Sequence, residues 1–202
     1  MVSKTKINHQ EKNKGKIIII SGPSGVGKGS IIKEITKHNT TMHVSVSATT
    51  RPKRDTETHQ KEYYFLTDSE FDQKINENAF LEWCHVHQHR YGTLQEVTEK
   101  QLNLNKNVIL EVDVQGAKKI MNYCHFHQQD YISIFIIPPT LNTIKERLYI
   151  RKTESEDMIK TRLERAKEEL NEKEYYQFIV INDCLNEAVK DVNGILTERN
   201  AC

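Results

Sequence analysis

No segment of this 202-residue chain approaches the ~20 consecutive apolar residues that a membrane-spanning helix requires. Residues 1–14 are polar and lysine-rich and have no apolar centre, so we expect a disordered lead-in rather than a secretory signal. An excess of charge is also missing, because 29 Lys and Arg side chains oppose 28 Asp and Glu. A net charge of +1 gives no global field that would recruit nucleic acid or an anionic membrane, so we expect neither as a partner.

Cysteine is scarce and widely spaced. The four cysteines form no Cys-x-x-Cys pair, and they are Cys84, Cys124, Cys184 and Cys202. This spacing favours reduced thiols in a cytoplasmic protein over a disulfide framework. A hydrophobic content of 37% with 28% charged residues fits a globular enzyme, and the length suits one α/β domain with insertions.

Glycine is scarce as well, yet four of the eight glycines lie within residues 22–29. The sequence Gly-Pro-Ser-Gly-Val-Gly-Lys-Gly-Ser follows an apolar run and precedes a helical pattern at 30–35, which is the context that a phosphate-binding P-loop requires. Glycines let successive N–H groups point at one anion, and the helix N-terminus adds its dipole. Gly29 replaces the usual Ser or Thr after Lys28, and Ser30 follows one step later. We predict nucleotide binding by Gly22, Pro23, Ser24, Gly25, Val26, Gly27, Lys28, Gly29 and Ser30.

Short β-branched runs alternate with helical patterns along most of the chain. The runs occupy residues 17–21, 108–113, 131–137 and 178–182, and each has the composition of a strand covered on both faces. Helical patterns occupy residues 115–121, 141–148, 157–173 and 185–196. This alternation predicts an α/β fold, a P-loop core with a parallel sheet flanked by helices.

Residues 42–103 interrupt the alternation with turn-prone stretches and short alternating segments at 62–66 and 80–86. Residues 149–157 are polar and charged between two helical patterns, a composition typical of a lid. We therefore predict a tail at 1–14 and a domain at 15–197. Its core would comprise 15–46 and 100–197, with an inserted mixed α/β lobe at 47–99 and a helical lid at 149–157.

Two arginines mark a second anion site. Arg51 and Arg54 lie three residues apart around Pro52, and two guanidinium forks this close suit a phosphate, although a solvated basic turn would have the same sequence. Tyr63 and Tyr91 fall in the same lobe, and their hydroxyls could complete a phosphate cage.

Glu82 lies between Leu81 and Trp83, where a carboxylate is costly unless it has a partner. A guanine edge offers two donors, N1–H and N2–H₂, which one carboxylate accepts together. Adenine has only an acceptor at N1 and would leave the carboxylate unpaired. This position therefore indicates a guanine-binding site.

Acidic residues end the strand at 108–113. Glu111 and Asp113 would face the same side and help to place Mg²⁺, although Glu111 could equally end the sheet in a salt bridge. We predict no direct protein ligand, with Ser30 and Asp113 acting through water. The alternating histidines at 85, 87 and 89 lack a nearby fourth ligand for zinc, so we predict no metal there.

Over residues 16–197 the chain resembles the guanylate kinases of the nucleoside monophosphate kinase group. The resemblance rests on GPSGVGKGS and SVSATTRPKR, which occur in the family's order. It implies Mg²⁺-dependent transfer of the ATP γ-phosphoryl group to GMP. It implies GMP contacts from Ser47, Arg51, Arg54, Tyr63, Glu82, Tyr91, Thr93 and Asp113. It also implies catalytic cations at Lys28, Arg147, Arg151 and Arg162, with Asn182 beside the adenine of ATP.

One position departs from the family pattern, because Gln60 stands where Gly or Ala is usual. Two other functions stay open, a non-catalytic guanylate-kinase-like binding module and a P-loop kinase for another small phosphate acceptor. A regulatory GTPase is disfavoured, since the chain has no Asn-Lys-x-Asp motif. We expect ATP and GMP as small-molecule partners, a monomer or a homodimer, and a cytoplasmic location.

Overall fold

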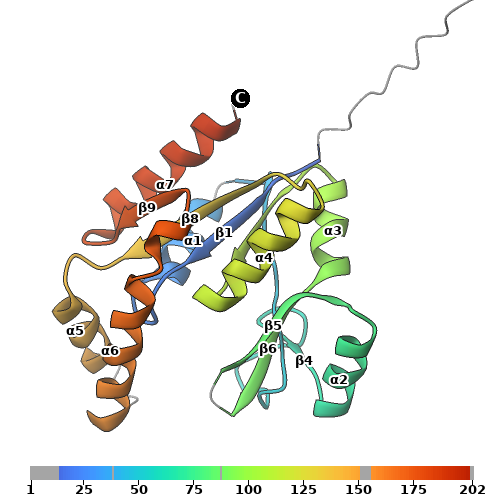
Figure 1. Cartoon of the computed structure of the whole chain (residues 1–202), viewed down its shortest axis with the longest axis horizontal. Helices are drawn as coiled ribbons and strands as arrows, with labels where there is room; N and C mark the ends of the chain where they lie inside the picture. Colours follow the sequence, from blue (N-terminus) through green and yellow to red (C-terminus); the bar gives the residue numbers. More distant parts are fainter. Residues whose placement is uncertain (1–13, 38, 87, 151–155, 201–202) are drawn as a thin grey trace, which may run out of the picture.

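A five-stranded parallel sheet forms the centre of the protein in a computed structural model, which describes residues 14–37, 39–86, 88–150 and 156–200. The strand order is β2 (Met42–Val44), β7 (Asn107–Glu111), β1 (Ile17–Ser21), β8 (Tyr131–Ile137) and β9 (Phe178–Ile181). Figure 1 shows helices on both faces of this sheet. The arrangement confirms the predicted α/β fold with a parallel sheet flanked by helices.

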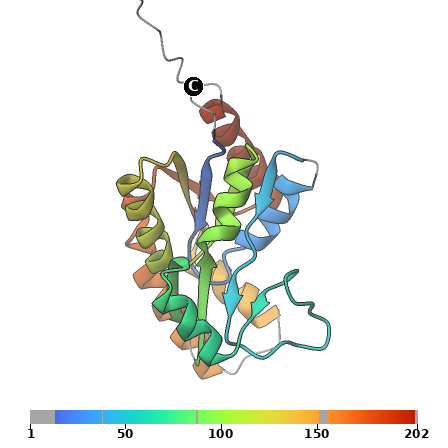
Figure 2. The same ribbon diagram turned by 90° about the vertical axis from the view of Figure 1, so that its right-hand side faces the viewer.

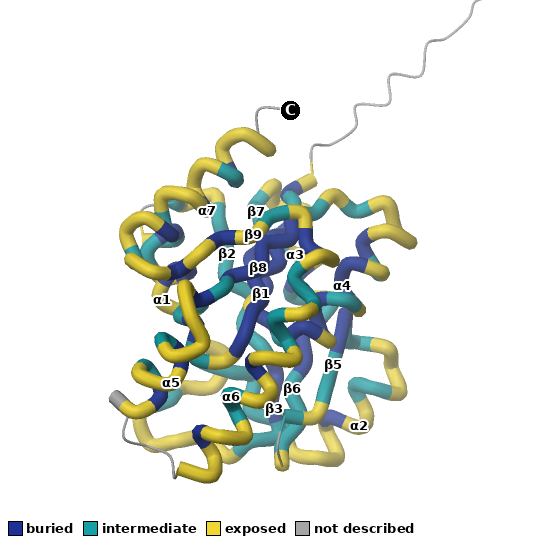
Figure 3. Tube along the Cα trace, turned by 60° about the vertical axis from the view of Figure 1, so that its left-hand side comes forward, coloured by how far each residue is buried: buried dark blue, intermediate teal, exposed yellow. Residues whose placement is uncertain are grey.

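The run of four isoleucines in β1 is buried on both sides, because successive strand residues face opposite ways. Ile18 and Ile20 pack with α1 (Lys28–Thr36) and α7 (Leu185–Asn200) on one face. Ile17 and Ile19 pack with α4 (Val114–Phe126) and Leu102 of α3 (Gln95–Asn103) on the other. In Figure 3 this buried layer runs through the middle of the molecule. The core therefore fixes the end of β1, where the P-loop begins.

A second sheet of four strands lies below the core sheet in Figures 1 and 2. Its order is β4 (Tyr64–Phe65), β3 (Ala48–Thr49), β6 (His89–Leu94) and β5 (Phe80–Val86). β3 pairs parallel with β4 and antiparallel with β6, so the sheet is mixed. Its own apolar cluster includes Phe71 of α2 (Asp68–Asn76), which stacks on Phe80 at 4.6 Å between ring centroids. This sheet falls within the lobe proposed at 47–99, whose boundaries stay a proposal.

Element ends differ from the predictions by a few residues. The predicted strand at 108–113 ends at Glu111, because Asp113 instead caps α4 and its Oδ1 accepts from the Gly116 N–H at 2.7 Å. The predicted helix at 157–173 is α6 (Glu156–Leu170), followed by the 3₁₀ turn η1 (Lys173–Tyr175). β2 was not anticipated as a strand, and it extends the core sheet at its edge.

Helix α5 (Leu141–Ile150) packs against α6 through a separate small cluster that includes Ile144, Leu148 and Ile159. Between these helices, residues 151–155 of the proposed lid lie outside the described residues, and so does Arg151. Among the ranges that the structure describes, no helix combines the length and apolar character needed to cross a membrane.

Candidate active site

A cleft of about 1100 Å³ opens at the carboxyl ends of β1 and β7, between the P-loop, the second sheet and α6. Crevices at this edge of a parallel sheet are where α/β proteins bind their ligands. Nine of the residues predicted to form the site line this cleft: Gly22, Ser24, Lys28, Ser47, Tyr63, Glu82, Tyr91, Asp113 and Arg162. The fold therefore brings together residues that are 140 positions apart in the sequence.

The P-loop has the backbone that its glycines predict. Gly22 and Gly27 have φ values of 138° and 102°, which side-chain-bearing residues rarely adopt. A Cβ atom on Gly22 would lie 2.2 Å from the Ile136 carbonyl oxygen, so the loop also needs glycine to pass β8. Gly27 precedes α1 without a side-chain cap, which leaves the N–H groups of this helix start for an anion.

Lys28 lies across the loop. Its Nζ donates to the carbonyl oxygens of Gly22 at 2.6 Å and Pro23 at 3.2 Å. Burial lowers the pKa of Lys28, and the carboxylates of Glu111 and Glu169 oppose that shift. The ammonium is thus held by loop carbonyl groups near several carboxylates.

Arg51 is packed and oriented by its neighbours. Its guanidinium lies 5.4 Å from the ring centroid of Tyr63 and 5.6 Å from that of Phe65. Hydrogen bonding to Glu57, and more weakly to Tyr91, raises the pKa of Arg51. Tyr63 and Tyr91 meet edge to face, with ring centroids 5.9 Å apart. One arginine and two tyrosines therefore lie together, and their binding of a phosphate stays a prediction.

Glu57 is a site residue that the sequence reasoning missed. One of its carboxylate oxygens accepts from Arg51 Nη2 at 2.6 Å, and the other accepts from the Arg54 backbone N–H at 2.9 Å. The Arg54 side chain itself is exposed. Because both oxygens of Glu57 are engaged, this one carboxylate fastens the loop that carries both arginines.

Glu82 is buried at the base of the cleft, with 6% of its surface exposed. Its Oε1 accepts from the Thr93 hydroxyl at 2.8 Å, across the β5–β6 ladder where the two residues pair. Burial, and more weakly the carboxylate of Asp113, raises the pKa of Glu82 to about 7. Glu82 also lines the cleft, and a carboxylate there could accept from two adjacent N–H donors.

The carboxylate of Glu111 lies beside the P-loop, where a Mg²⁺ ion bound with ATP would be expected. A Cβ atom on Gly29 would lie 3.6 Å from Glu111 Oε2, so this carboxylate adjoins the place of the usual Ser or Thr hydroxyl. Oxygen donors of this kind fit Mg²⁺ with several waters. Ser30 is exposed and does not line the cleft. In the described ranges, no three His, Cys, Asp or Glu side chains form a metal-binding group.

Arg147 occupies a different place from the other predicted cations. Its guanidinium donates to the carbonyl oxygens of Val26 at 3.0 Å and Asn182 at 2.9 Å, so it joins the P-loop to the segment after β9. Asn182 is buried, and its Nδ2 also donates to the Val26 carbonyl oxygen, at 2.7 Å. Both predicted nucleotide contacts therefore support the outer side of the P-loop. Their roles toward ATP stay predictions.

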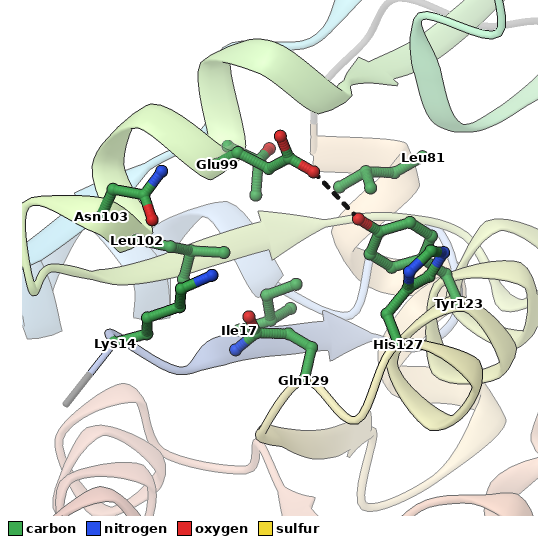
Figure 4. A pocket seen from close by; sticks show the side chains of 10 residues that line it. Lys14, Ile17, Leu81, Glu99, Leu102, Asn103, Tyr123, His127 and Gln129 are labelled. Atoms are coloured by element: carbon green, nitrogen blue, oxygen red, sulfur yellow. Dashed lines mark hydrogen bonds between the residues drawn. The ribbon is translucent and has the colours of Figure 1, made fainter. Parts of the chain in front are cut away.

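A smaller pocket of about 240 Å³ lies elsewhere, between α3 and α4. Figure 4 shows apolar Ile17, Leu81 and Leu102 at its walls, and the Tyr123 hydroxyl donating to Glu99. None of the predicted site residues lines it, so it is distinct from the cleft.

A parallel sheet with a P-loop, a second lobe in which Arg51, Tyr63 and Tyr91 lie together, and a cleft lined by both define a P-loop kinase that acts on a nucleotide acceptor. The chain belongs to the guanylate kinase family, whose model matches residues 14–199. It is 44% identical over 192 residues to the guanylate kinase of Malacoplasma penetrans, covering 94% of this chain and 97% of the relative. It is 41% identical to that of Thermotoga maritima, with 93% and 89% covered.

A solved structure agrees with these relatives. The crystal structure of guanylate kinase from Anaplasma phagocytophilum matches with a TM-score of 0.72 at 27% identity, covering 93% of this chain and 87% of that one. The activity of the protein is therefore that of a guanylate kinase, an ATP:GMP phosphotransferase. The similarity settles the family and the reaction, while the roles of single residues must be argued from the cleft.

Proposed function

We propose that the cleft carries out Mg²⁺-dependent transfer of the ATP γ-phosphoryl group to GMP, with the P-loop holding ATP and the second lobe holding GMP. The observation that carries this assignment is that Lys28 and Glu82 line one cleft from opposite walls. Transfer between two phosphates needs no side-chain base, because the acceptor phosphate is itself the nucleophile. It needs both substrates in line and cations around the moving group.

Lys28 supplies the central cation. Its two carbonyl partners are neutral acceptors, so phosphate oxygens that carry charge compete for its protons effectively. Arg162 lines the same cleft from α6, and we propose that it closes over the triphosphate with Arg147 and Arg151. Arg147 must leave its carbonyl partners to do so, whereas Lys28 only exchanges partners within the loop.

The acceptor lobe would hold GMP at both ends. Arg51, Tyr63 and Tyr91 would bind its phosphate, joined by Arg54 and Ser47 at the mouth. Glu82 and Asp113 would accept from the N1–H and N2–H₂ groups of guanine, with Thr93 fixing the carboxylate of Glu82. An adenine N1 would face the carboxylate with a lone pair and leave a buried acceptor unpaired, which is the basis of selectivity.

A bound Mg²⁺ would supply positive charge that offsets part of the negative charge on the ATP phosphates. We propose that Glu111, Asp113 and Ser30 hold its waters rather than the ion itself. Gly29 provides no hydroxyl, and the acids that approach the loop are the oxygen donors available.

The partners of the protein in this proposal are ATP and GMP, with no nucleic acid or membrane, as a monomer or homodimer in the cytoplasm. Cys84 and Cys124 are free thiols that stay partly or fully buried, which suits a reducing compartment.

The test is an ADP-release assay with ATP and each of GMP, dGMP, AMP, UMP and CMP, with and without Mg²⁺. We expect turnover with the two guanine nucleotides, dependent on Mg²⁺. Binding of GMP without ADP release would instead indicate a non-catalytic module. Preference for a pyrimidine or adenine acceptor would refute the role of Glu82.

A further inference from the structure

The cleft face of the second sheet carries a grid of four side chains, and three of them belong to the proposed GMP site. Glu82 pairs with Thr93, and Cys84 pairs with Tyr91 in the same β5–β6 ladder. Residues two apart on a strand face the same side, so Cys84 shares the face of Glu82. Cys84 also lines the cleft. It is the fourth member of the grid, and the proposed function leaves it without a role.

The thiol of Cys84 reaches from the lobe to the core. Its Sγ lies 3.6 Å from Asp113 Oδ2, a hydrogen-bonding distance for sulfur. Asp113 is the N-cap of α4, and its other oxygen, Oδ1, accepts from the Gly116 N–H at 2.7 Å. The carboxylate is therefore held at both oxygens, once by its own helix and once by the lobe.

We propose that Cys84 is a positioning residue that sets the selectivity of the kinase for guanine by holding Asp113. The thiol donates to one lone pair of Asp113 Oδ2. The second lone pair of this oxygen is left to accept a proton of the guanine 2-amino group. This inference rests on the proposed role of Asp113 in GMP binding.

The chemistry of the thiol suits this task. Burial, together with the carboxylates of Asp113 and Glu82, raises the pKa of Cys84 to about 12, so the thiol keeps the proton that it donates. The S–H group is a weak donor, so it can orient a carboxylate while leaving it basic enough to accept from the substrate.

A substrate without the 2-amino group separates this role from a structural one. IMP carries hypoxanthine, which keeps N1–H but has hydrogen at C2. If Cys84 acts through Asp113 on the 2-amino group, Cys84→Ala should lower kcat/KM for GMP about fivefold through KM. The same change should leave IMP and the KM for ATP nearly unaffected. The GMP-to-IMP ratio of kcat/KM would then fall about fivefold, or about 1 kcal/mol at 25 °C.

A double-mutant cycle tests the route through Asp113. Asp113→Asn keeps an N-cap residue and so preserves α4, and Cys84→Ala should have no further effect on the ratio in that background. Cys124→Ala is the matched control, because it removes a buried thiol from the core, far from the cleft. It should lower the melting temperature and leave the ratio unchanged.

Three results would overturn the proposal. An unchanged ratio in Cys84→Ala would remove the selectivity role, and a full effect that persists in Asp113→Asn would remove the route through Asp113. A ratio that falls equally in Cys124→Ala would show that destabilisation alone is responsible. These outcomes differ from failure of the proposed function, in which the unaltered protein would not prefer GMP at all.

Discussion

Arg51 and Glu57 form an ion pair at 2.6 Å within the loop between β3 and β4, with 15% and 11% of their side-chain surfaces exposed. Arg51 Nη1 donates to the Pro52 carbonyl oxygen at 2.9 Å while Nη2 donates to Glu57. Tyr91 is a third hydrogen-bonding partner, so two of the five N–H groups of the guanidinium remain for a phosphate. The ion pair therefore orients the arginine without using up its capacity to bind.

Simple charge counting and this geometry make opposite predictions for Glu57→Ala. Removing an anion beside a phosphate site should strengthen GMP binding by Coulomb attraction, but it also frees Arg51 to sample many rotamers. Orientation should dominate, because Glu57 also accepts from the Arg54 backbone N–H, so its removal frees the loop as well as the guanidinium. We expect GMP to bind about tenfold more weakly and guanosine, which has no phosphate, to bind as before. Titration calorimetry with both ligands measures this.

The control for that experiment is Asp55→Ala, which removes the same charge from the same loop at an exposed position. It should leave both affinities within about twofold. Tighter GMP binding in Glu57→Ala would mean that the carboxylate competes with the substrate rather than preparing its site.

Lys28→Ala should lower kcat by on the order of 10² or more, because the ammonium stabilises charge that develops in the transition state. The fold should survive, since the Nζ bonds only to loop carbonyls. Lys33→Ala removes an exposed lysine from the same helix and should leave kcat unchanged. Near-native turnover in Lys28→Ala, measured by ADP release, would contradict the assignment.

Glu82→Gln should impair GMP use and stabilise the protein at alkaline pH. The amide presents a donor where guanine also has donors, so kcat/KM for GMP should fall about 10²-fold. AMP should not become a good substrate, because Thr93 and Asp113 remain.

The stability effect follows from the raised pKa of Glu82, about 7 against an ordinary 4.5. Between these values the folded state keeps a proton that the unfolded state has released, so the native protein loses stability as pH rises through this window. The loss is at most roughly 3 kcal/mol.

Glu82→Gln should therefore have a higher melting temperature than the native protein at pH 8, and this gap in melting temperature should shrink towards pH 5. A gap independent of pH would show that Glu82 is not neutral in the folded protein at low pH. Glu96→Gln, at an exposed carboxylate, should show no gap at either pH.

Gln60 adopts a left-handed backbone with φ of 68°, at the position where the family usually has Gly or Ala. Its N–H donates to the Tyr63 carbonyl oxygen at 2.8 Å, so the turn is held despite the unfavourable residue. Gln60→Gly should stabilise the protein by roughly 0.5–1 kcal/mol, since relief of strain exceeds the entropy lost by glycine. Thr56→Gly, where φ is not positive, should do the reverse. Calorimetric melting of both variants measures whether each substitution raises or lowers the stability of the protein.

Several elements could be predicted because the local sequence alone specifies them. The strand before the P-loop was located to the residue, since four isoleucines in a row fit only a strand buried on both faces. Asp113 was correctly linked to the cleft but assigned to the strand. Its capping hydrogen bond depends on the residue at which α4 begins, and the local sequence does not specify that residue.

Glu57 and Cys84 show what local sequence leaves open. Glu57 lies in a loop with Lys53, Arg54 and Lys61 as well as Arg51, so its sequence neighbours do not reveal its partner. Cys84 has no motif, and its contact with Asp113 joins the second sheet to the start of α4 across 29 positions.

The sequence by itself determined the P-loop, the order of strands and helices, and the residue types of the acceptor site, because these depend on spacing along the chain. The tertiary structure alone decided which side chains meet across the cleft. It joins Cys84 to Asp113 and directs Arg147 to the back of the P-loop. Such contacts depend on how lobe, core and α6 pack. That packing is set by burial summed over the whole chain, which no local pattern records.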